Sequence, residues 1–487
     1  MKSRHIIALS LLLTTVTAGL SRAQVTAVVD GTQDARVLSI EEAVKLALVN
    51  NLNLLSIVDQ VSSAQISEGL ARSQFGLKVT PFFARGFGSQ TTVDQRYGVD
   101  VSKLLSFGTT ISANVASDMA RNEIGNLTSS NVSFMLTQPL LRGFGPTSTQ
   151  YNMTNARRGT ESSNRNLDIN RQRLVVAVVA SYYNILRQKG LVEVAEGSMA
   201  RSKELLRASE ARLKVGLASK LDIFRAELQL SQAEEGVITR QEALELALDD
   251  FKFKLGLGPE EQVVLEMVEP EYQPVKLDIE ELTRIALSRR VEVLEERDRI
   301  GDAQRSASVS RQNLLPQLDL NVRYEQRGFG PSLGESFDFR DQGLNFFFST
   351  SYQLDHSAER ASHAQSQIDL AARRRSLRLV EYNVANEVRA AARNVERVAK
   401  SIVLQERNMD FAEKQRRLAN LRYQRGLASN FDIIDAENNV INARGNYVSL
   451  LADYFVSLIE LKRVTGMLDI DREFAPGRFL PPARHHP

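Results

Sequence analysis

The sequence of 487 residues contains no cysteine, which excludes disulfide bonds, thiolate metal sites, cysteine catalysis and a lipid attached to an amino-terminal cysteine. Tryptophan is absent as well, and aromatic residues make up only 7% of the chain. Ala, Leu, Glu, Arg, Gln and Ser dominate long stretches instead, which is typical of extended helices. This composition argues against a compact enzyme.

Neither the charge nor the histidine content indicates a binding site for nucleic acid or a metal. The 61 basic residues are nearly balanced by 59 acidic ones, and no basic block is dense enough to follow a phosphate backbone. His356 and His363 are seven residues apart and share a helical face only across two turns, roughly 10 Å along the axis. One metal ion is not expected to bind both.

One segment matches a catalytic pattern, but its context does not. Gly330 to Gly334 fits the nucleophile elbow around Ser332, which requires a strand before the serine and a helix after it. Here the segment falls between two expected strands, and no phosphate-binding glycine loop occurs elsewhere. We therefore expect no enzyme activity: no catalytic residue, no metal site and no cofactor.

Residues 1–23 are typical of an export signal. Lys2 and Arg4 provide a positive start, residues 6–13 are apolar, and residues 21–23 offer small residues for cleavage. After this signal the chain lacks the run of roughly 20 largely apolar residues that a membrane helix needs. Contact with a bilayer is therefore expected to use strands.

The mature chain is composed of two copies of one plan. The segment Gly216-Leu217-Ala218-Ser219 recurs as Gly426-Leu427-Ala428-Ser429, 210 positions later, and the residues after it recur at the same offset. A match over this length indicates a duplication, with equally long helices on both sides of the segment.

The first copy contains more residues than the second between its first helix and its long helix. The copies begin alike at Ile40-Glu41-Glu42 and Ile279-Glu280-Glu281, where the offset is 239 rather than 210, so the surplus is 29 residues. It falls between Lys78 and Thr149, and insertions of this kind usually lie in loops.

Each copy is predicted to run helix, strand pair, long helix, turn and helix. An amphipathic helix is expected from about Ile40 to Gln74. Long helices are expected at about 160–215 and 358–425, where Gly is rare and Pro is absent, with lengths on the order of 80 to 100 Å. Helices of that length must be buried by neighbours along their course, as in coiled coils.

Strand pairs are expected at about 78–141 and 318–354, where β-branched and aromatic residues are frequent. Lipid-facing alternation is visible but weak, as at Phe134 and Leu136 or at Phe346 and Phe348. Residues 97–105 and 109–116, joined by a Ser-Phe-Gly turn, are candidates for a further hairpin inside the surplus. We interpret this segment as an elongated external loop.

Together these features resemble the TolC-like outer membrane efflux proteins over nearly the whole mature chain. The turn segments, 215–226 and 425–436, look like the family's periplasmic tip motif, which occurs once in each copy. The resemblance implies a mainly helical protein with membrane strands: a twelve-stranded outer-membrane β-barrel shared by three chains and continued by a periplasmic α-helical barrel. Four strands per chain are too few to close a barrel. A barrel shared by several chains would pair the backbone hydrogen-bonding groups at the sheet edges, which lipid cannot do.

The expected boundaries follow from the repeats. After the signal peptide, residues 24–270 form the first repeat with its tip turn at 215–222, and residues 271–468 form the second with its tip turn at 425–432. Residues 469–487 are a carboxy-terminal tail.

The resemblance implies that the protein is the outer-membrane duct of a tripartite efflux pump or type I secretion system. Its expected partners are two further copies of itself, a periplasmic adaptor protein, an inner-membrane transporter reached through the adaptor, and outer-membrane lipid, but no nucleic acid. The alternative is a non-conducting coiled-coil protein that spans the periplasm.

The hairpin tips are the first candidate site. Gly216 and Gly426 follow long helices, where a left-handed residue is needed, and this structural role is the plain alternative for them. Leu217 and Leu427 have little to bury within an exposed tip. By resemblance, these Gly-Leu tips dock the adaptor.

Asp432 and Asp435 are the second candidate site, because a spacing of three places them on nearly the same helical face. By resemblance they line the constricted entrance, where threefold acidic rings favour cations. The alternative for Asp432 is a favourable charge at a helix start. The matching position for Asp435 in the first copy is Arg225, so capping does not explain it.

Tyr423 and Asp222 are the third candidate site. By resemblance, this tyrosine and aspartate link the second hairpin to the first and hold the entrance shut. The alternative is a tyrosine that only packs. The family's companion arginine is replaced by Ala428, so the closed state is expected to be looser or held otherwise.

Overall fold

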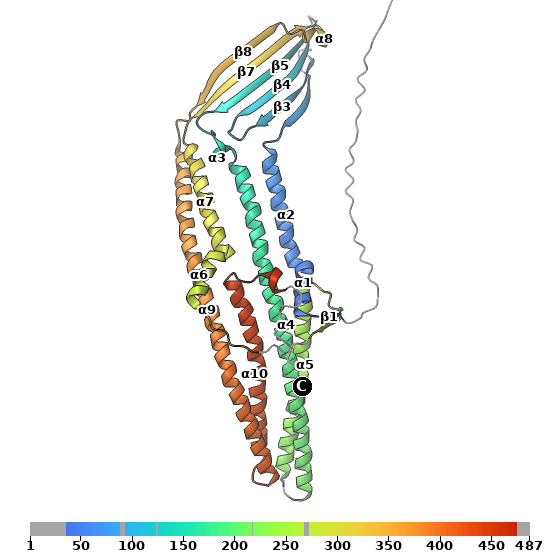
Figure 1. The fold of residues 1–487 in the computed structure, drawn as a ribbon. Coiled ribbons are helices and arrows are strands. Elements are labelled where there is room, and N and C mark those ends of the chain that lie inside the picture. Colours follow the sequence, from blue (N-terminus) through green and yellow to red (C-terminus); the bar gives the residue numbers. More distant parts are fainter. Residues whose placement is uncertain (1–35, 88–92, 123–124, 217, 267–271, 475–487) are drawn as a thin grey trace, which may run out of the picture.

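The computed structural model describes residues 36–87, 93–122, 125–216, 218–266 and 272–474. The predicted signal peptide, Leu217 and most of the predicted carboxy-terminal tail lie outside these residues. The chain is an elongated column of helices with one β-sheet at its end (Figure 1). This mainly helical architecture with a strand sheet confirms the predicted fold class.

The two repeats contain matching helices. The shorter helices are α1 (Ile40–Asn50), α2 (Leu52–Ser73), α6 (Ile279–Arg289) and α7 (Val291–Gln312). The longer ones are α4 (Tyr151–Lys214), α5 (Lys220–Leu255), α9 (Ser357–Gln424) and α10 (Asn430–Val464). Both α1 and α6 have 11 residues, and both α2 and α7 have 22. The duplication seen in the sequence is therefore also present in the structure.

The helix ends follow local sequence signals. Asn51 interrupts the expected first helix because its side chain accepts a hydrogen bond from Leu54 N and so starts α2. Gly256 ends α5 in the left-handed conformation, and Gly466 adopts the same conformation just after α10. None of the described helices is both long and apolar enough to cross a membrane.

The long helices form two antiparallel hairpins, α4–α5 and α9–α10, that lie side by side through α4 and α10 (Figure 1). At 64 and 68 residues, α4 and α9 are roughly 96 and 102 Å long. Each hairpin is buried against the short helices of its own repeat. One apolar core contains Val178, Ile185 and Phe251, and the other contains Val388, Val395 and Tyr454.

A short parallel sheet closes the middle of the column. Strand β1 (Arg36–Leu38) pairs with β6 (Val263–Leu265), which follows α5. Leu38 and Leu265 are both buried in the first core. This pair attaches the start of the described chain to the link between the two repeats.

The large sheet is antiparallel and has six strands in the order β2-β3-β4-β5-β7-β8. Their bounds are β2 (Lys78–Phe87), β3 (Val93–Leu104), β4 (Thr110–Asn122), β5 (Gly125–Pro139), β7 (Gln317–Gly330) and β8 (Asp341–Ser351). The strand number therefore differs from the expected four, because residues 97–105 and 109–116 belong to β3, β4 and their turn rather than to an external loop. Unbroken pairing with β2 and β5 holds them in the sheet.

Within the described residues, three further helices have four residues each. Helix α3 (Pro146–Thr149) precedes α4, α8 (Leu333–Ser336) lies between β7 and β8, and α11 (Ile470–Glu473) follows α10. Ser332 of the elbow-like segment caps α8 by accepting a hydrogen bond from Glu335 N at 3.4 Å. Its hydroxyl thus has a structural role in the β7–β8 connection.

Candidate functional site at the hairpin tips

The two tip turns share one backbone geometry. Gly216 and Gly426 both have φ of 74°, a conformation that glycine adopts without strain. Their amides donate to the carbonyls of Leu213 and Tyr423, each at 2.9 Å. Both glycines therefore end a long helix in the way that the sequence pattern predicts, and the tips follow directly.

Each helix that leaves a tip begins with a capping box. Ser219 Oγ accepts from Asp222 N at 3.2 Å, and Asp222 Oδ2 accepts from Ser219 N at 2.9 Å. Ser429 and Asp432 repeat this arrangement at the second tip. The hydrogen bond from the serine backbone lowers the pKa of both carboxyls, which remain ionised at neutral pH.

The tips expose apolar side chains that their own chain does not bury. Leu427 is 74% exposed. Further side chains near the tips are more than half exposed, among them Val215, Leu221, Phe224 and Phe431. The candidate residues from the sequence did not include Leu221, Phe224 or Phe431, although apolar residues in the first turn of a helix after a tip are a usable signal. Such an exposed apolar set suits contact with another protein.

Asp432 and Asp435 lie on the exposed side of α10. Ile433, Ala436 and Glu437, which alternate with them, are buried against the neighbouring helices. Asp435 accepts a hydrogen bond from Asn439 Nδ2 at 3.4 Å, and Asp432 is engaged in its capping box. Both carboxylates thus face away from the core of their own chain, and Asp435 has no capping role.

Tyr423 lies between the two hairpins, and its neighbours differ from those expected. Its hydroxyl is 3.3 Å from Ser209 Oγ on α4, whereas the Asp222 carboxylate bonds to Ser219. The connection to Asp222 runs through Asn430, whose Nδ2 donates to the Asp222 carbonyl at 2.8 Å and to Ser209 Oγ at 2.9 Å. The structure therefore brings Tyr423 and Asp222 into one network without a direct bond.

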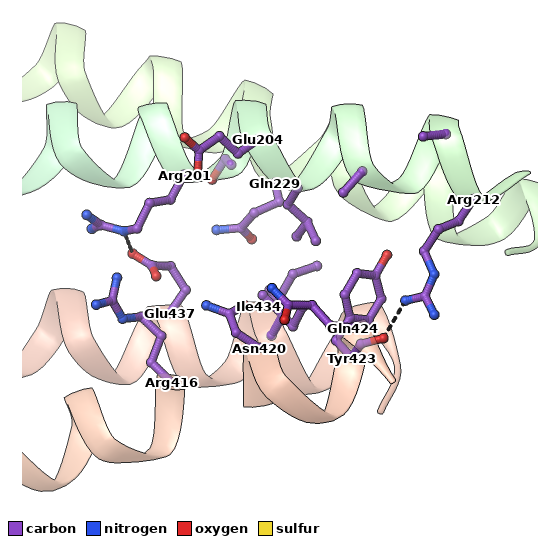
Figure 2. Close-up of a pocket in the computed structure, with 15 residues that line it drawn as sticks. Arg201, Glu204, Arg212, Gln229, Arg416, Asn420, Tyr423, Gln424, Ile434 and Glu437 are labelled. Carbon is purple, nitrogen blue, oxygen red and sulfur yellow. Dashed lines mark hydrogen bonds and ion pairs between the residues drawn. The ribbon is translucent and has the colours of Figure 1, made fainter. Parts of the chain in front are cut away.

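Arg212 of α4 reaches across to Tyr423 of α9. Its guanidinium lies 4.2 Å from the centre of the ring, and Nη1 donates to the Tyr423 carbonyl at 2.7 Å (Figure 2). The arginine thus combines a cation–π contact with a charged hydrogen bond. Arg212 was not among the candidate residues predicted from the sequence.

Beside Arg212, the hairpins meet through a small apolar cluster. Leu205, Ala226, Tyr423 and Ile433 form its buried part, and Ala428 packs against it. Ala428, which replaces the family's arginine, therefore contributes packing rather than charge. The charge at this interface comes from the opposite hairpin, on Arg212.

A second polar link lies deeper between the hairpins. Arg201 on α4 and Glu437 on α10 form an ion pair at 2.5 Å, and the Glu437 side chain is only 8% exposed (Figure 2). Between this pair and Arg212 is a cavity of about 690 Å³. Because a buried carboxylate is costly without a partner, the pair favours one arrangement of the hairpins.

The side chains at the tips suit a binding interface and a channel entrance. Within the described ranges, no group of three or more acidic or histidine side chains is placed to hold a metal ion. The tips instead offer apolar side chains outside, acidic side chains on one exposed helical side, and polar links between hairpins. These features suit docking and opening rather than bond chemistry.

The chain was compared with protein families and with known proteins. The family model described as outer membrane efflux protein matches residues 43–256 and 282–467. The chain is 21% identical to the probable efflux pump outer membrane protein TtgC and to the antibiotic efflux pump outer membrane protein ArpC, both of Pseudomonas putida. Each match covers 307 residues, 60% of this chain and 60% of the relative. The chain thus spans less than two thirds of the length of these relatives.

Solved structures share the fold at lower identity. The outer membrane protein VceC of Vibrio cholerae superposes with a TM-score of 0.69 at 15% identity, over 88% of this chain and 96% of VceC. CusC gives a TM-score of 0.68 at 15% identity, over 88% and 92% of the two chains. At such identities the likeness establishes the architecture.

Proposed function

The chain belongs to the outer membrane efflux protein family, and on that basis we propose that it is the passive exit duct of a tripartite efflux pump or type I secretion system. It resides in the outer membrane and extends into the periplasm, and its relatives are efflux channels rather than enzymes. In this proposal an inner-membrane transporter supplies the substrate through a periplasmic adaptor.

The observation that carries the proposal is the pair of helical hairpins, each ending in an exposed tip. The long helices α4 and α9, each roughly 100 Å, reach far from the sheet, and α5, α9 and α10 leave much of their surface exposed within their own chain. Three copies around one axis cover further surface and enclose a tunnel. The sheet edges β2 and β8 point to the same assembly, since each needs a partner strand in lipid.

The exposed apolar tips support adaptor docking. Leu427 and Phe431 belong to the second tip, and Phe224 to the first, so each chain offers two related docking points. Gly426 lets the chain turn there without covering Leu427, and Leu217 is the residue at the matching sequence position of the first repeat.

The acidic side of α10 supports a cation-selective entrance. In a trimer, Asp432 and Asp435 each become a ring of three carboxylates, which attracts cations and repels anions. Tyr423, Asp222 and their network hold the two hairpins of a chain together near these rings. Opening then requires the hairpins to separate.

The test is single-channel recording in a planar bilayer with divalent cations titrated on the periplasmic side. We expect cation-selective currents that divalent cations block in the wild type and block much less in Asp435→Ala. Glu242→Ala is the matched control, because Glu242 is an exposed acid on α5 far from the tip. An absence of current from a verified trimer would support the non-conducting structural alternative.

A further inference from the structure

The two faces of the six-stranded sheet differ in chemistry across its whole width. The pairing register sets which residues share a face: Val99 pairs with Val115, Val115 with Val132, and Val132 with Gln326. Residues two apart along a strand remain on the same face. The faces of all six strands can therefore be compared at equal depth.

One face carries an apolar band in the middle of every strand. Its members share the face of Val99 and are Val79, Pro81 and Phe83 on β2, Tyr97 and Val101 on β3, Ile111, Ala113 and Val115 on β4, Val132, Phe134 and Leu136 on β5, Leu320, Val322 and Tyr324 on β7, and Leu344, Phe346 and Phe348 on β8. Charged residues of this face, Arg85 and Lys103, lie toward the strand ends. The band crosses β3 and β4 without interruption.

The opposite face is polar, and its polar groups bond across β3 and β4. Arg96 of β3 forms an ion pair with Asp118 of β4 at 3.2 Å, and Asn114 bonds to Asp100. Further along the sheet, Asn321 bonds to both Thr137 and Ser349 at 2.9 Å. These bonds show that the β3–β4 hairpin continues the polar face of its neighbours.

The polar face also carries apolar residues, with Leu127 and Phe329 toward one end of the sheet and Phe82 and Phe347 beside arginines. Phe82 lies under the guanidinium of Arg96, and Phe347 under that of Arg323, each at 5.9 Å from the ring centre. Their presence does not turn this face into a second apolar band. A polar face opposite an apolar band is the pattern of a membrane strand around an aqueous lumen.

The turn between β3 and β4 lies at the same end of the sheet as the helices, so these two strands run the full height of the sheet, as the other strands do. Gly145 N, just before α3, donates to Phe107 O at 3.1 Å, and Thr109 Oγ1 bonds to the side chain of Gln138 near the end of β5. The turn therefore lies at the helical end of the sheet (Figure 1). With 12 and 13 residues, β3 and β4 exceed the roughly 9–11 that a tilted membrane strand needs.

We propose that the β3–β4 hairpin is a pair of membrane strands whose apolar face, around Val99 and Val115, contacts lipid acyl chains. Continuity with the bands of β5, β7 and β8 identifies the occupant as lipid. This inference rests on the proposed outer-membrane duct and deepens it. Three chains of six strands then close a barrel of eighteen strands rather than twelve.

An eighteen-strand barrel changes the size of the outer opening. Because barrel diameter grows roughly linearly with strand number, the opening is about one and a half times as wide as with twelve strands. Barrels of 16–18 strands leave an aqueous channel in porins. The narrowest part of the duct then lies at the helical tips rather than at the membrane.

Single cysteines test the proposal directly, because the natural chain has none. Val99→Cys and Val115→Cys are labelled with bimane and the trimer is placed in liposomes with either brominated phospholipid or aqueous iodide. We expect brominated lipid to remove most of the fluorescence and iodide to remove little. Phe134→Cys on β5 is the membrane control, and Ser112→Cys on the polar face of β4 should show the reverse pattern.

The possible outcomes distinguish a failure of this inference from a failure of the proposed duct function. If iodide quenches both β3–β4 probes while brominated lipid quenches Phe134→Cys, the hairpin lies outside the bilayer and the duct stands. If the Phe134→Cys probe is also aqueous, the membrane position of the whole sheet is overturned. Cryo-electron microscopy of the unmodified trimer in nanodiscs provides an independent count, where twelve membrane strands would refute the proposal.

Discussion

Arg212 lies over the ring of Tyr423 at 4.2 Å and donates a 2.7 Å hydrogen bond to its backbone carbonyl. These two residues come from different repeats, so the contact joins the α4–α5 hairpin to the α9–α10 hairpin just above the tips. The family resemblance implied an arginine at position 428, where this chain has an alanine that packs beside Tyr423. The hairpins are thus held by an arginine from the opposite side.

Loss of this contact should open the entrance. In Arg212→Ala the cation–π contact, about 0.5–2 kcal/mol, and the charged hydrogen bond are both removed. We expect a larger or more frequently open channel in planar bilayers, with Arg212→Lys intermediate because lysine lacks the planar fork. Arg207→Ala, an exposed arginine on the same helix, should behave as the wild type. Equal currents in all variants would show that this contact does not hold the gate.

The Arg201–Glu437 pair should stabilise the association of the hairpins. Removing Arg201 leaves Glu437 buried without its partner, which costs roughly 3–5 kcal/mol for a fully buried pair and less here because Arg201 is partly exposed. Thermal unfolding should show a lower midpoint for Arg201→Ala than for Arg201→Ala combined with Glu437→Ala. A fully additive double-mutant cycle would contradict this coupling.

The capping boxes should make the tips sensitive to acid. The pKa values of Asp222 and Asp432 are lowered in the folded state, so their stabilisation is present above the ordinary aspartate pKa and is lost as the pH falls through the lowered value. Hydrogen exchange in the first turns of α5 and α10, corrected for intrinsic rates, should therefore rise below about pH 4. Asp222→Asn together with Asp432→Asn should abolish this pH dependence. An unchanged profile would argue against the capping role.

The apolar tips should be needed for export but not for folding. Leu427→Ser together with Phe431→Ser removes two exposed side chains without opening a cavity, so the melting temperature should change little. We expect the host to lose tolerance of exported toxic compounds at unchanged amounts of trimer. Lys220→Ala, a polar exposed change at the other tip, is the control. Full tolerance in the double variant would place docking elsewhere.

The sequence was most informative where local rules decide the structure. The 210-residue offset predicted two equal hairpins, and Gly216 and Gly426 predicted their turns, because a left-handed helix end depends on the residue itself. The network around Tyr423 could not be predicted from the sequence. Its partners are set by how α4 and α10 align, and a side chain such as Asn430 takes its role only in that alignment.

The β3–β4 hairpin shows a different limit. Val99, Val101, Ile111, Ala113 and Val115 do alternate with polar residues, but an alternation over so few positions is weak in one strand. Only the register across six strands reveals that the apolar positions form one band. The surplus in the first repeat was therefore interpreted as a loop when it adds strands.

The pairing of β1 with β6 has a consequence for the order of biogenesis. Leu265 follows Leu38 by 227 positions, so the two can meet only after the whole first repeat has been translocated and has reached its hairpin form. Contacts between such distant residues form slowly because a long loop must close first. In a newly secreted chain Leu38 therefore stays unburied until β6 has been translocated and can pair with β1.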